Sequence, residues 1–479
     1  MQLPLVAPAP IVAQAAPAFR DVFENRCEYA HFQHYLTGLM VLENKSLANL
    51  ARCTLDSADK TNLSRFLSEA PWSAQALNAA RVQFMLRETR PWQDRSGNGK
   101  LSLDDTLCEH VGNLFEFVDQ HYDHCSDSFA LGHNLVTSHF VSGAVRLALE
   151  WRLYRRYEEW TQWPACVARQ WPDRPIPTER AARIKFRKAG LPELLEQDAD
   201  FAALHESFQT KLDLAGELVA AALEAGVPFS VVLMDGWYLA PELVQQITKA
   251  GKDWVSIVKK NRGVETQSFC LRDAHGQPIV FAGSTVRLDE LIPLIPRQAY
   301  RQVQVKGQTY WCFTFTARLP SLGKVRLVVS FGHADLSGTA VVLASNRVDW
   351  SASQILSTYT WRWPIETFYQ DGKQLLGLDS YRMRDAQAIA KHWSLVFLAH
   401  GLLHLASLQS STKRGAKVPA KSIGTVCREQ SQILVEKLIL YAHDQLAGGH
   451  SPSQVFAHLF AKMQPVRGND RPRLAPAPG

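Results

Sequence analysis

Residues 229–238 of the chain are Phe-Ser-Val-Val-Leu-Met-Asp-Gly-Trp-Tyr, and this stretch decides the fold class. The run from Phe229 to Met234 is short and apolar, which is typical of a strand buried on both faces. An amphipathic helix is predicted before it, because apolar residues from Leu204 to Leu223 recur at spacings of 4, 4, 3, 4 and 4. A helix over residues 241–249 and a strand over 254–258 follow. This alternation indicates an α/β domain with a buried sheet.

The same domain extends toward the N-terminus through further predicted strands. They cover residues 101–105, 133–140 and 144–154. Residues 160–188 are rich in Pro and Arg and are expected to form an irregular, basic loop.

Toward the C-terminus, the pattern becomes β-rich over residues 259–350 and then helical again. The predicted strands of this insertion are residues 302–305, 310–317, 325–331 and 340–344. Helical periodicity runs from residue 351 to 408. A basic linker follows, and then helices over 422–446 and 452–463 and a Pro-rich end.

The N-terminal region is expected to be helical after a disordered leader of residues 1–19. Helices are predicted over residues 46–51 and 59–67, and Asp59 is a candidate N-cap of the second one. Two short helices joined by a tight turn can form a helix-turn-helix motif, which binds DNA. The alternative interpretation of these helices is a plain helical bundle without a ligand. If the helix reads DNA, its polar side supplies the contacts, from Lys60, Asn62 and Arg65.

These observations divide the chain into six expected segments. They are a leader (1–19), a helical DNA-binding domain (20–95), the first part of an α/β core (96–258), a β-rich insertion (259–350), the second part of the core (351–408) and a helical C-terminal segment (409–479).

Composition favours a cytoplasmic protein with a polyanionic partner. The 52 Lys and Arg residues exceed the 46 Asp and Glu residues and give a net charge of +6. Residues 1–19 contain no Lys or Arg and four prolines, so they resemble neither a signal peptide nor a transit peptide. The most apolar stretch, residues 395–408, contains two histidines and is shorter than the ~20 residues of a membrane span.

A cluster of cysteines and histidines offers a weak alternative metal site. It spans 18 residues and consists of Cys108, His110, His121, His124 and Cys125. Its spacing matches no common zinc module, and strand-borne His and Cys are more often packing residues, so packing is the favoured interpretation.

Three acidic positions are the candidates for catalysis. Asp104 and Asp105 are predicted to end the first strand, Asp235 follows the buried strand, and Glu366 lies in the helical segment after the insertion. Acids gathered at one edge of a sheet can hold two divalent ions that promote in-line phosphoryl transfer. Each acid also has an ordinary alternative, as a turn residue, a cap or a solvated side chain.

The segment around Glu366 strengthens the functional interpretation. At 100° per residue, Tyr359, Arg362, Glu366 and Lys373 fall within a 60° arc of one continuous helix. Arg, Lys and Tyr beside a carboxylate are suited to binding phosphates, with Arg binding in a bidentate way. Pro364 is expected to kink or restart the helix. The alternative is a surface helix in which Arg362 and Glu366 form an i,i+4 pair worth about 0.3–0.5 kcal/mol.

The order of these motifs resembles one known family. The signature Y-x2-R-x3-E-x6-K, which is typical of a large group of bacterial insertion-sequence transposases of the DDE type, consists here of Tyr359, Arg362, Glu366 and Lys373. Further matching motifs are Asp-Asp-Thr at 104–106, Asp-Gly-Trp-Tyr at 235–238, Lys-Lys-Asn-Arg at 259–262 and Arg-Trp-Pro-Ile-Glu at 362–366. The resemblance extends over residues 20–410.

The resemblance implies an RNase H-like α/β core interrupted by a β-rich insertion. In this family the acid directly before Thr is catalytic, which implies that Asp105, Asp235 and Glu366 form the metal-binding triad, with Asp104 as the alternative to Asp105. Tyr359, Arg362 and Lys373 resemble the residues that hold phosphates at the transposon end.

The implied function is a DNA transposase that binds the terminal inverted repeats of its element, cleaves there and joins the 3′ ends to target DNA. The implied cofactor is Mg²⁺, for which Mn²⁺ substitutes, and the implied partners are double-stranded DNA and, in the DNA complex, a second copy of the chain. No G-x-x-x-x-G-K-[ST] loop occurs, so no nucleotide cofactor is expected. The expected localisation is the cytoplasm, at the nucleoid. The alternatives are a domesticated DNA-binding protein and a metal-dependent DNA nuclease of the same fold.

Overall fold

The computed structural model describes residues 3–55, 60–123, 127–412 and 420–463, and the chain forms two compact units. The first unit combines both ends of the chain, Met1–Arg81 and Asp371–Gly479, and the second is Val82–Gln370. One boundary between the units lies in the middle of α5 (Ala74–Thr89), and the other lies just before the last residue of α14 (Pro364–Asp371).

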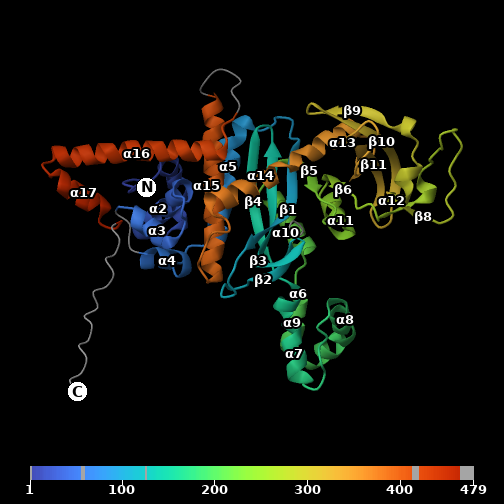
Figure 1. Cartoon of the computed structure of the whole chain (residues 1–479), viewed down its shortest axis with the longest axis horizontal. Coiled ribbons are helices and arrows are strands. Elements are labelled where there is room, and N and C mark those ends of the chain that lie inside the picture. The colour runs from blue at the N-terminus through green and yellow to red at the C-terminus, as the bar shows by residue number, and fades with distance from the viewer. Residues whose placement is uncertain (1–2, 56–59, 124–126, 413–419, 464–479) are drawn as a thin grey trace, which may run out of the picture. The chain divides into compact units, whose positions relative to one another are not determined.

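The second unit is built on a ten-stranded mixed sheet with the order β2-β3-β1-β5-β6-β12-β11-β10-β9, in which β4 also pairs with β3 (Figure 1). The pairs β1–β5 and β5–β6 are parallel, whereas the other pairs within the described ranges are antiparallel. The strands are β1 (Gly99–Glu109), β2 (Asp119–Asp123), β3 (Ser128–Ser142), β4 (Val145–Tyr154), β5 (Phe229–Met234), β6 (Asp253–Ile257), β9 (Arg301–Val305), β10 (Gln308–Leu319), β11 (Gly323–Phe331) and β12 (Val341–Ser345).

The centre of the sheet agrees with the sequence pattern that predicted it. In β5, Val231 to Met234 are all buried, as expected for a strand with neighbours on both edges and cover on both faces. The helix α11 (Pro241–Lys249) and the strand β6 follow β5 as predicted. The mixed α/β class is therefore confirmed.

Two local predictions upstream of β5 are wrong. The helix predicted from Leu204 to Leu223 is two helices, α9 (Ala199–Glu206) and α10 (Lys211–Glu224), because Thr210 and Asp213 form a capping box that starts a new helix. Residues 160–188 are largely helical, in α6 (Tyr157–Thr161), α7 (Trp163–Gln170) and α8 (Arg180–Gln197).

The helices of the predicted loop form because they share a small core of their own. Trp163, Cys166, Leu194 and Phe201 are buried together, although they come from three different helices. Pro164 lies in the first turn of α7, where a missing N–H costs nothing. The prolines thus mark helix ends and connections instead of excluding helices.

The β-rich insertion is present with the predicted strands. Its strands β9 to β12 continue the main sheet, since β12 pairs with β6. The insertion also contains a two-stranded sheet of β7 (Gly263–Glu265) and β8 (Thr285–Arg287) and the short helix α12 (Leu288–Leu291). The remaining helices of this unit are α13 (Ala352–Tyr359), α14 and the 3₁₀ turns η2 (Arg90–Trp92), η3 (Thr266–Ser268), η4 (Ile292–Leu294), η5 (Arg297–Ala299) and η6 (Thr360–Arg362).

The described part of the first unit is helical. Figure 1 shows α16 crossing α15 at a steep angle. Its elements are α1 (Pro10–Ala15), η1 (Ala16–Val22), α2 (Arg26–Val41), α3 (Leu47–Cys53), α4 (Lys60–Ser68), the start of α5, the π-helical η7 (Gly372–Leu376), α15 (Ala386–Thr412), α16 (Ile423–Ala447) and α17 (Pro452–Phe460).

The leader that was expected to be disordered is folded from residue 10 onward. Val12 and Phe19 are buried, and Phe19 packs against Phe32 of α2. Pro10 and Pro17 lie in the first turns of α1 and η1, where they do not interrupt a helix, and Pro4 and Pro8 precede α1. The two helices predicted after it are present as α3 and α4, whereas the predicted N-cap Asp59 lies outside the described residues.

A buried histidine joins α2 to α15 in this unit. His392 Nε2 donates to the carbonyl of Gly377 at 2.8 Å, and the Tyr35 hydroxyl donates to His392 Nδ1 at 2.9 Å. Because a carbonyl can only accept, Nε2 carries a proton, and when the ring is neutral Nδ1 accepts from the Tyr35 hydroxyl. Burial lowers the pKa of His392 to about 4.

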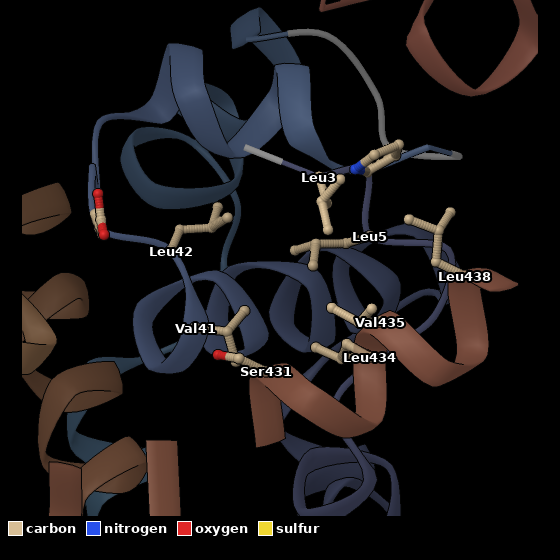
Figure 2. Close-up of a pocket in the computed structure, with 10 residues that line it drawn as sticks. Leu3, Leu5, Val41, Leu42, Ser431, Leu434, Val435 and Leu438 are labelled. Atoms are coloured by element: carbon tan, nitrogen blue, oxygen red, sulfur yellow. The ribbon is translucent and has the colours of Figure 1, made fainter. Parts of the chain in front are cut away.

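A pocket of about 210 Å³ in the first unit is lined mainly by aliphatic side chains (Figure 2). It lies between the first residues of the chain, the end of α2 and one face of α16, and includes Leu5, Leu42 and Leu434. It contains none of the acids expected to be catalytic. None of the helices in the described ranges combines the length and the apolar character needed to cross a membrane.

Candidate active site

Asp104 and Asp105 lie in the middle of β1 and not at its end, so that prediction is wrong. β1 continues to Glu109 because it pairs with β3, in which Thr137 lies opposite Asp104 and Val136 opposite Asp105. Successive side chains of a strand point to opposite faces. The side chains of Asp104 and Asp105 therefore lie on opposite faces of the sheet.

On the first face, Arg362 links Asp104 to Glu366. Its Nη1 donates to Oδ2 of Asp104 at 2.5 Å, and its Nη2 donates to Oε1 of Glu366 at 2.7 Å. The side chains of Arg362 and Asp104 are only 16% and 15% exposed, and that of Glu366 is 38% exposed. The i,i+4 pair considered from the sequence is thus present, but the same guanidinium also holds a buried acid from a distant strand.

The charges at this link are not fully balanced. Burial raises the pKa of Asp104 to about 7, and Arg362 opposes this rise, while the negative charges of Asp105 and Glu366 add to it. Burial lowers the pKa of Arg362, but the neighbouring Asp104 outweighs that effect and holds it above its usual value. The guanidinium of Arg362 is therefore permanently charged, and additional positive charge near Asp104 would still be favourable.

Helix α14 is fixed over the same face by a buried hydroxyl pair. The hydroxyls of Thr137 on β3 and Tyr369 on α14 are 2.5 Å apart, and the rings of His139 and Phe368 are in contact at 4.8 Å. These contacts hold Glu366 in place beside β1. Sequence reasoning did not identify Tyr369 as part of the site.

On the opposite face, Asp105 is surrounded by three donors. Lys211 Nζ lies 2.7 Å from Oδ2, Asn134 Nδ2 donates to Oδ2 at 3.0 Å, and the Tyr238 hydroxyl donates to Oδ1 at 3.0 Å. Burial raises the pKa of Asp105, but the charge of Lys211 and these hydrogen bonds outweigh it and leave the pKa below its usual value. Asp105 is therefore a satisfied, ionised carboxylate.

Asp235 follows β5, and its own loop fixes its side chain. Its Oδ1 accepts the backbone N–H groups of Trp237 and Tyr238 at 2.8 and 3.2 Å. Burial raises the pKa of Tyr359 to about 12, with Arg362 opposing the rise and Asp235 and Asp104 adding to it. The charges of both acids thus act on Tyr359.

The signature residues do not lie on one continuous helix. The chain passes from α13 through the 3₁₀ turn η6, restarts as α14 at Pro364 and becomes π-helical at Gly372. Tyr359, Arg362 and Glu366 nevertheless meet around Asp104. Lys373 lies in η7, which belongs to the first unit.

The residues predicted to read DNA are on the polar side of α4. Lys60, Asn62 and Arg65 are exposed, and Arg65 pairs with Glu69 at 3.6 Å. The apolar side of this helix, Leu63, Phe66 and Leu67, is buried as expected. The exposure agrees with a binding surface and equally with a plain solvated face.

The donor chemistry of the site fits a divalent ion, although its present geometry does not enclose one. The described residues contain no group of three or more His, Cys, Asp or Glu side chains arranged to hold a metal, and His124 and Cys125 of the possible zinc cluster lie outside them. Carboxylate oxygens are the ligands that Mg²⁺ prefers. The raised pKa of Asp104 shows that added positive charge would be favoured there.

The residues that sequence reasoning missed are the partners of the acids. Tyr238 was part of the recognised Asp-Gly-Trp-Tyr motif, but nothing in the motif shows that its hydroxyl reaches β1. Lys211, Asn134 and Tyr369 carry no local signal, because their contacts depend on pairing between distant segments.

Comparison with known proteins identifies the family. The family model described as DDE superfamily endonuclease matches residues 18–309. The chain is also similar to the piggyBac transposase in the cryo-EM structure of its synaptic complex with hairpin DNA, at 13% identity and a TM-score of 0.42, over 95% of this chain and 78% of that chain. No curated protein matches the chain.

Proposed function

The chain belongs to the DDE superfamily endonuclease family, and on this premise we propose that it is the DNA transposase of a bacterial insertion sequence. In this proposal it binds the terminal inverted repeats of its element, cleaves the DNA there and joins the 3′ ends to target DNA. The mixed α/β sheet is interpreted as an RNase H-like core interrupted by the β-rich insertion.

One observation carries the proposal. Asp104 on β1 and Glu366 on α14 share the guanidinium of Arg362, and Tyr359 lies within electrostatic reach of Asp104 and Asp235. A carboxylate of β1 and a carboxylate of α14 therefore meet at one Arg, and a phosphoryl-transfer site uses such carboxylates for metal ions and such a cation for the phosphate.

We assign the first catalytic acid to Asp104 in preference to Asp105. Asp104 is on the face that carries Arg362 and Glu366, whereas Asp105 already has three donors on the other face. The resemblance alone implied that Asp105 is the first catalytic acid. The alternation of side chains along β1 supports Asp104 instead.

The roles of the side chains follow from their chemistry. Asp104, Asp235 and Glu366 would hold the Mg²⁺ or Mn²⁺ ions, which when bound activate the attacking oxygen and stabilise the leaving oxygen. The raised pKa of Tyr359 keeps its hydroxyl protonated, so it can donate to a phosphate oxygen at neutral pH. Arg362 uses two of its five N–H donors on the acids, and the remaining donors can bind the scissile phosphate.

The proposed partners are double-stranded DNA and, in the DNA complex, a second copy of the chain. Recognition of the repeat is assigned to α4 and its neighbours, and no nucleotide cofactor is part of the reaction. The proposed location is the cytoplasm, at the nucleoid.

A plasmid assay tests this function. The full-length chain is incubated with Mg²⁺ and a supercoiled plasmid that carries the sequences bracketing its coding region. We expect cleavage at the two ends and joining of the 3′ ends to a second DNA. Asp104→Ala, Asp235→Ala and Glu366→Ala should each slow cleavage by a factor of about 100 or more, as loss of an electrostatic catalyst does, while end binding survives.

The controls separate the alternatives. Glu224→Ala removes an exposed acid at the end of α10 and should leave cleavage unchanged. Cleavage without joining would indicate a metal-dependent nuclease, and binding without cleavage a domesticated DNA-binding protein. If Asp105→Ala abolishes cleavage while Asp104→Ala does not, the assignment of the first acid is wrong.

A further inference from the structure

A second cluster of charge surrounds Trp361, the residue directly before Arg362. Lys306 Nζ lies 4.4 Å from the centre of the indole ring, Arg146 Cζ 4.7 Å and Lys100 Nζ 5.7 Å. These three cations come from segments far apart in the sequence, and they are hereafter called the Trp361 cluster. Cations within about 6 Å of an indole face are attracted by its π electrons.

The backbone constrains two of the cations of the Trp361 cluster, Lys306 and Arg146. Lys306 and Gly307 form the two-residue turn between β9 and β10, and both have positive φ, at 48° and 80°, which is the pattern of a tight hairpin turn. Arg146, at the start of β4, donates to the carbonyls of Gly143 and Val145 at 2.8 and 2.7 Å. The cations are therefore held near one another by the fold itself.

The charges of the Trp361 cluster repel one another. Burial lowers the pKa of Lys100, Asp94 opposes this, and Arg146 lowers it further. Burial also lowers the pKa of Lys306, again with a contribution from Arg146. Three cations near one carboxylate leave a positive cluster, and a bound anion would relieve the repulsion.

The Trp361 cluster lies on the same face of the sheet as Asp104. Lys100 and Asp104 are four residues apart on β1, so their side chains point to the same face and their Cα atoms are about 13 Å apart. A DNA strand advances about 3.4 Å per nucleotide along its axis, so a few nucleotides cover this separation. Trp361 is joined to Arg362 directly, and Lys306 is exposed to solvent.

We propose that Lys100, Arg146 and Lys306, arranged around Trp361, form a binding site for the phosphate backbone of the DNA strand that enters the site of Asp104 and Glu366. The proposal rests on the function proposed above and adds a contact surface to it. Contacts of lysine and arginine with backbone phosphates carry no sequence information, so this site positions the strand and does not read its sequence.

Salt-dependent DNA binding by the full-length chain tests the proposal. Affinity is measured without divalent ions, at several salt concentrations, for a duplex carrying an element end and an unrelated duplex of the same length. Lys306→Gln should make the slope of log affinity against log salt shallower by about 0.9 on both duplexes, which at 0.1 M salt is about an eightfold loss relative to the 1 M reference. Arg146→Gln should have a similar effect.

Lys324→Gln is the matched control, because Lys324 is an exposed lysine on β11 of the same sheet, away from Trp361. It should bind as wild type, and all variants should unfold at the wild-type temperature. An unchanged slope for Lys306→Gln would overturn the proposal, and so would a loss confined to the end sequence. Stabilisation of the wild type by inorganic phosphate, without a change in the DNA slope of the variants, would assign the site to a small phosphate and also overturn it. If the wild type binds neither duplex, the failure lies with the proposed function instead.

Discussion

Replacing His392 by glutamine should remove a large part of the acid sensitivity of the chain. In the folded protein the neutral ring of His392 is buried, accepts from Tyr35 and donates to Gly377. Its pKa is about 4 there, compared with about 6.5 for an unhindered histidine. When the chain unfolds, the ring is free to take up a proton at any pH below 6.5.

The sign of the effect follows from proton linkage. Between pH 6.5 and 4 the unfolded chain binds more protons at this residue than the folded chain does, so the free energy of unfolding rises with pH. The stabilisation is fully present above pH 6.5 and is lost as the pH falls through 4. The difference between a pKa of about 6.5 in the unfolded chain and about 4 in the folded chain corresponds to about 3 kcal/mol of stability.

Urea unfolding at pH 7, 6, 5 and 4 measures this contribution. From pH 7 to pH 4, the wild type should lose about 3 kcal/mol more than His392→Gln loses. The comparison cancels the other buried histidines, which both proteins share. His275→Gln, which replaces an exposed histidine, is the matched control. Parallel curves for wild type and His392→Gln, within about 0.5 kcal/mol, would refute the reasoning.

Three further predictions concern DNA. Arg362→Lys should impair cleavage in single-turnover assays, because an ammonium cannot reproduce the two-armed contact of the guanidinium, and wild-type rates would contradict this role. Lys373→Ala should make the salt slope of binding to a cleaved end shallower by about 0.9, whereas Lys324→Ala should leave that slope unchanged; equal slopes would show that Lys373 makes no phosphate contact. Alanine at the three exposed positions of α4 should abolish the preference for the element end over an unrelated duplex, and a footprint that stays on the end would move recognition elsewhere; the positions are Lys60, Asn62 and Arg65.

Local patterns predicted the elements whose stability depends on local pairing. The apolar run of β5, the helix α11 and the hairpins of the insertion were identified because their periodicity and turn residues lie within a few positions of each other. The helices α6 to α8 were missed because their apolar residues are sparse in each segment and form a core only when three segments meet.

The candidate acids could be named from the sequence, but their grouping could not. Which of two neighbouring strand residues faces a given helix depends on the register with β3, and β3 is about thirty residues away along the chain. The hydrogen-bond donors to Asp105 could not be predicted either, because Lys211 and Tyr238 are separated from it by more than a hundred residues.

The arrangement around Arg362 also explains how a cluster of acids can exist in a folded chain that holds no DNA. Buried carboxylates at one edge of a sheet repel each other, and an uncompensated buried charge is expensive. Here Arg362 stands between Asp104 and Glu366, and Asp235 is held separately by its own backbone turn. The acids are therefore kept in place by groups of the chain itself. A site built in this way can be rigid before the substrate arrives, which is what catalysis by positioning and charge stabilisation requires.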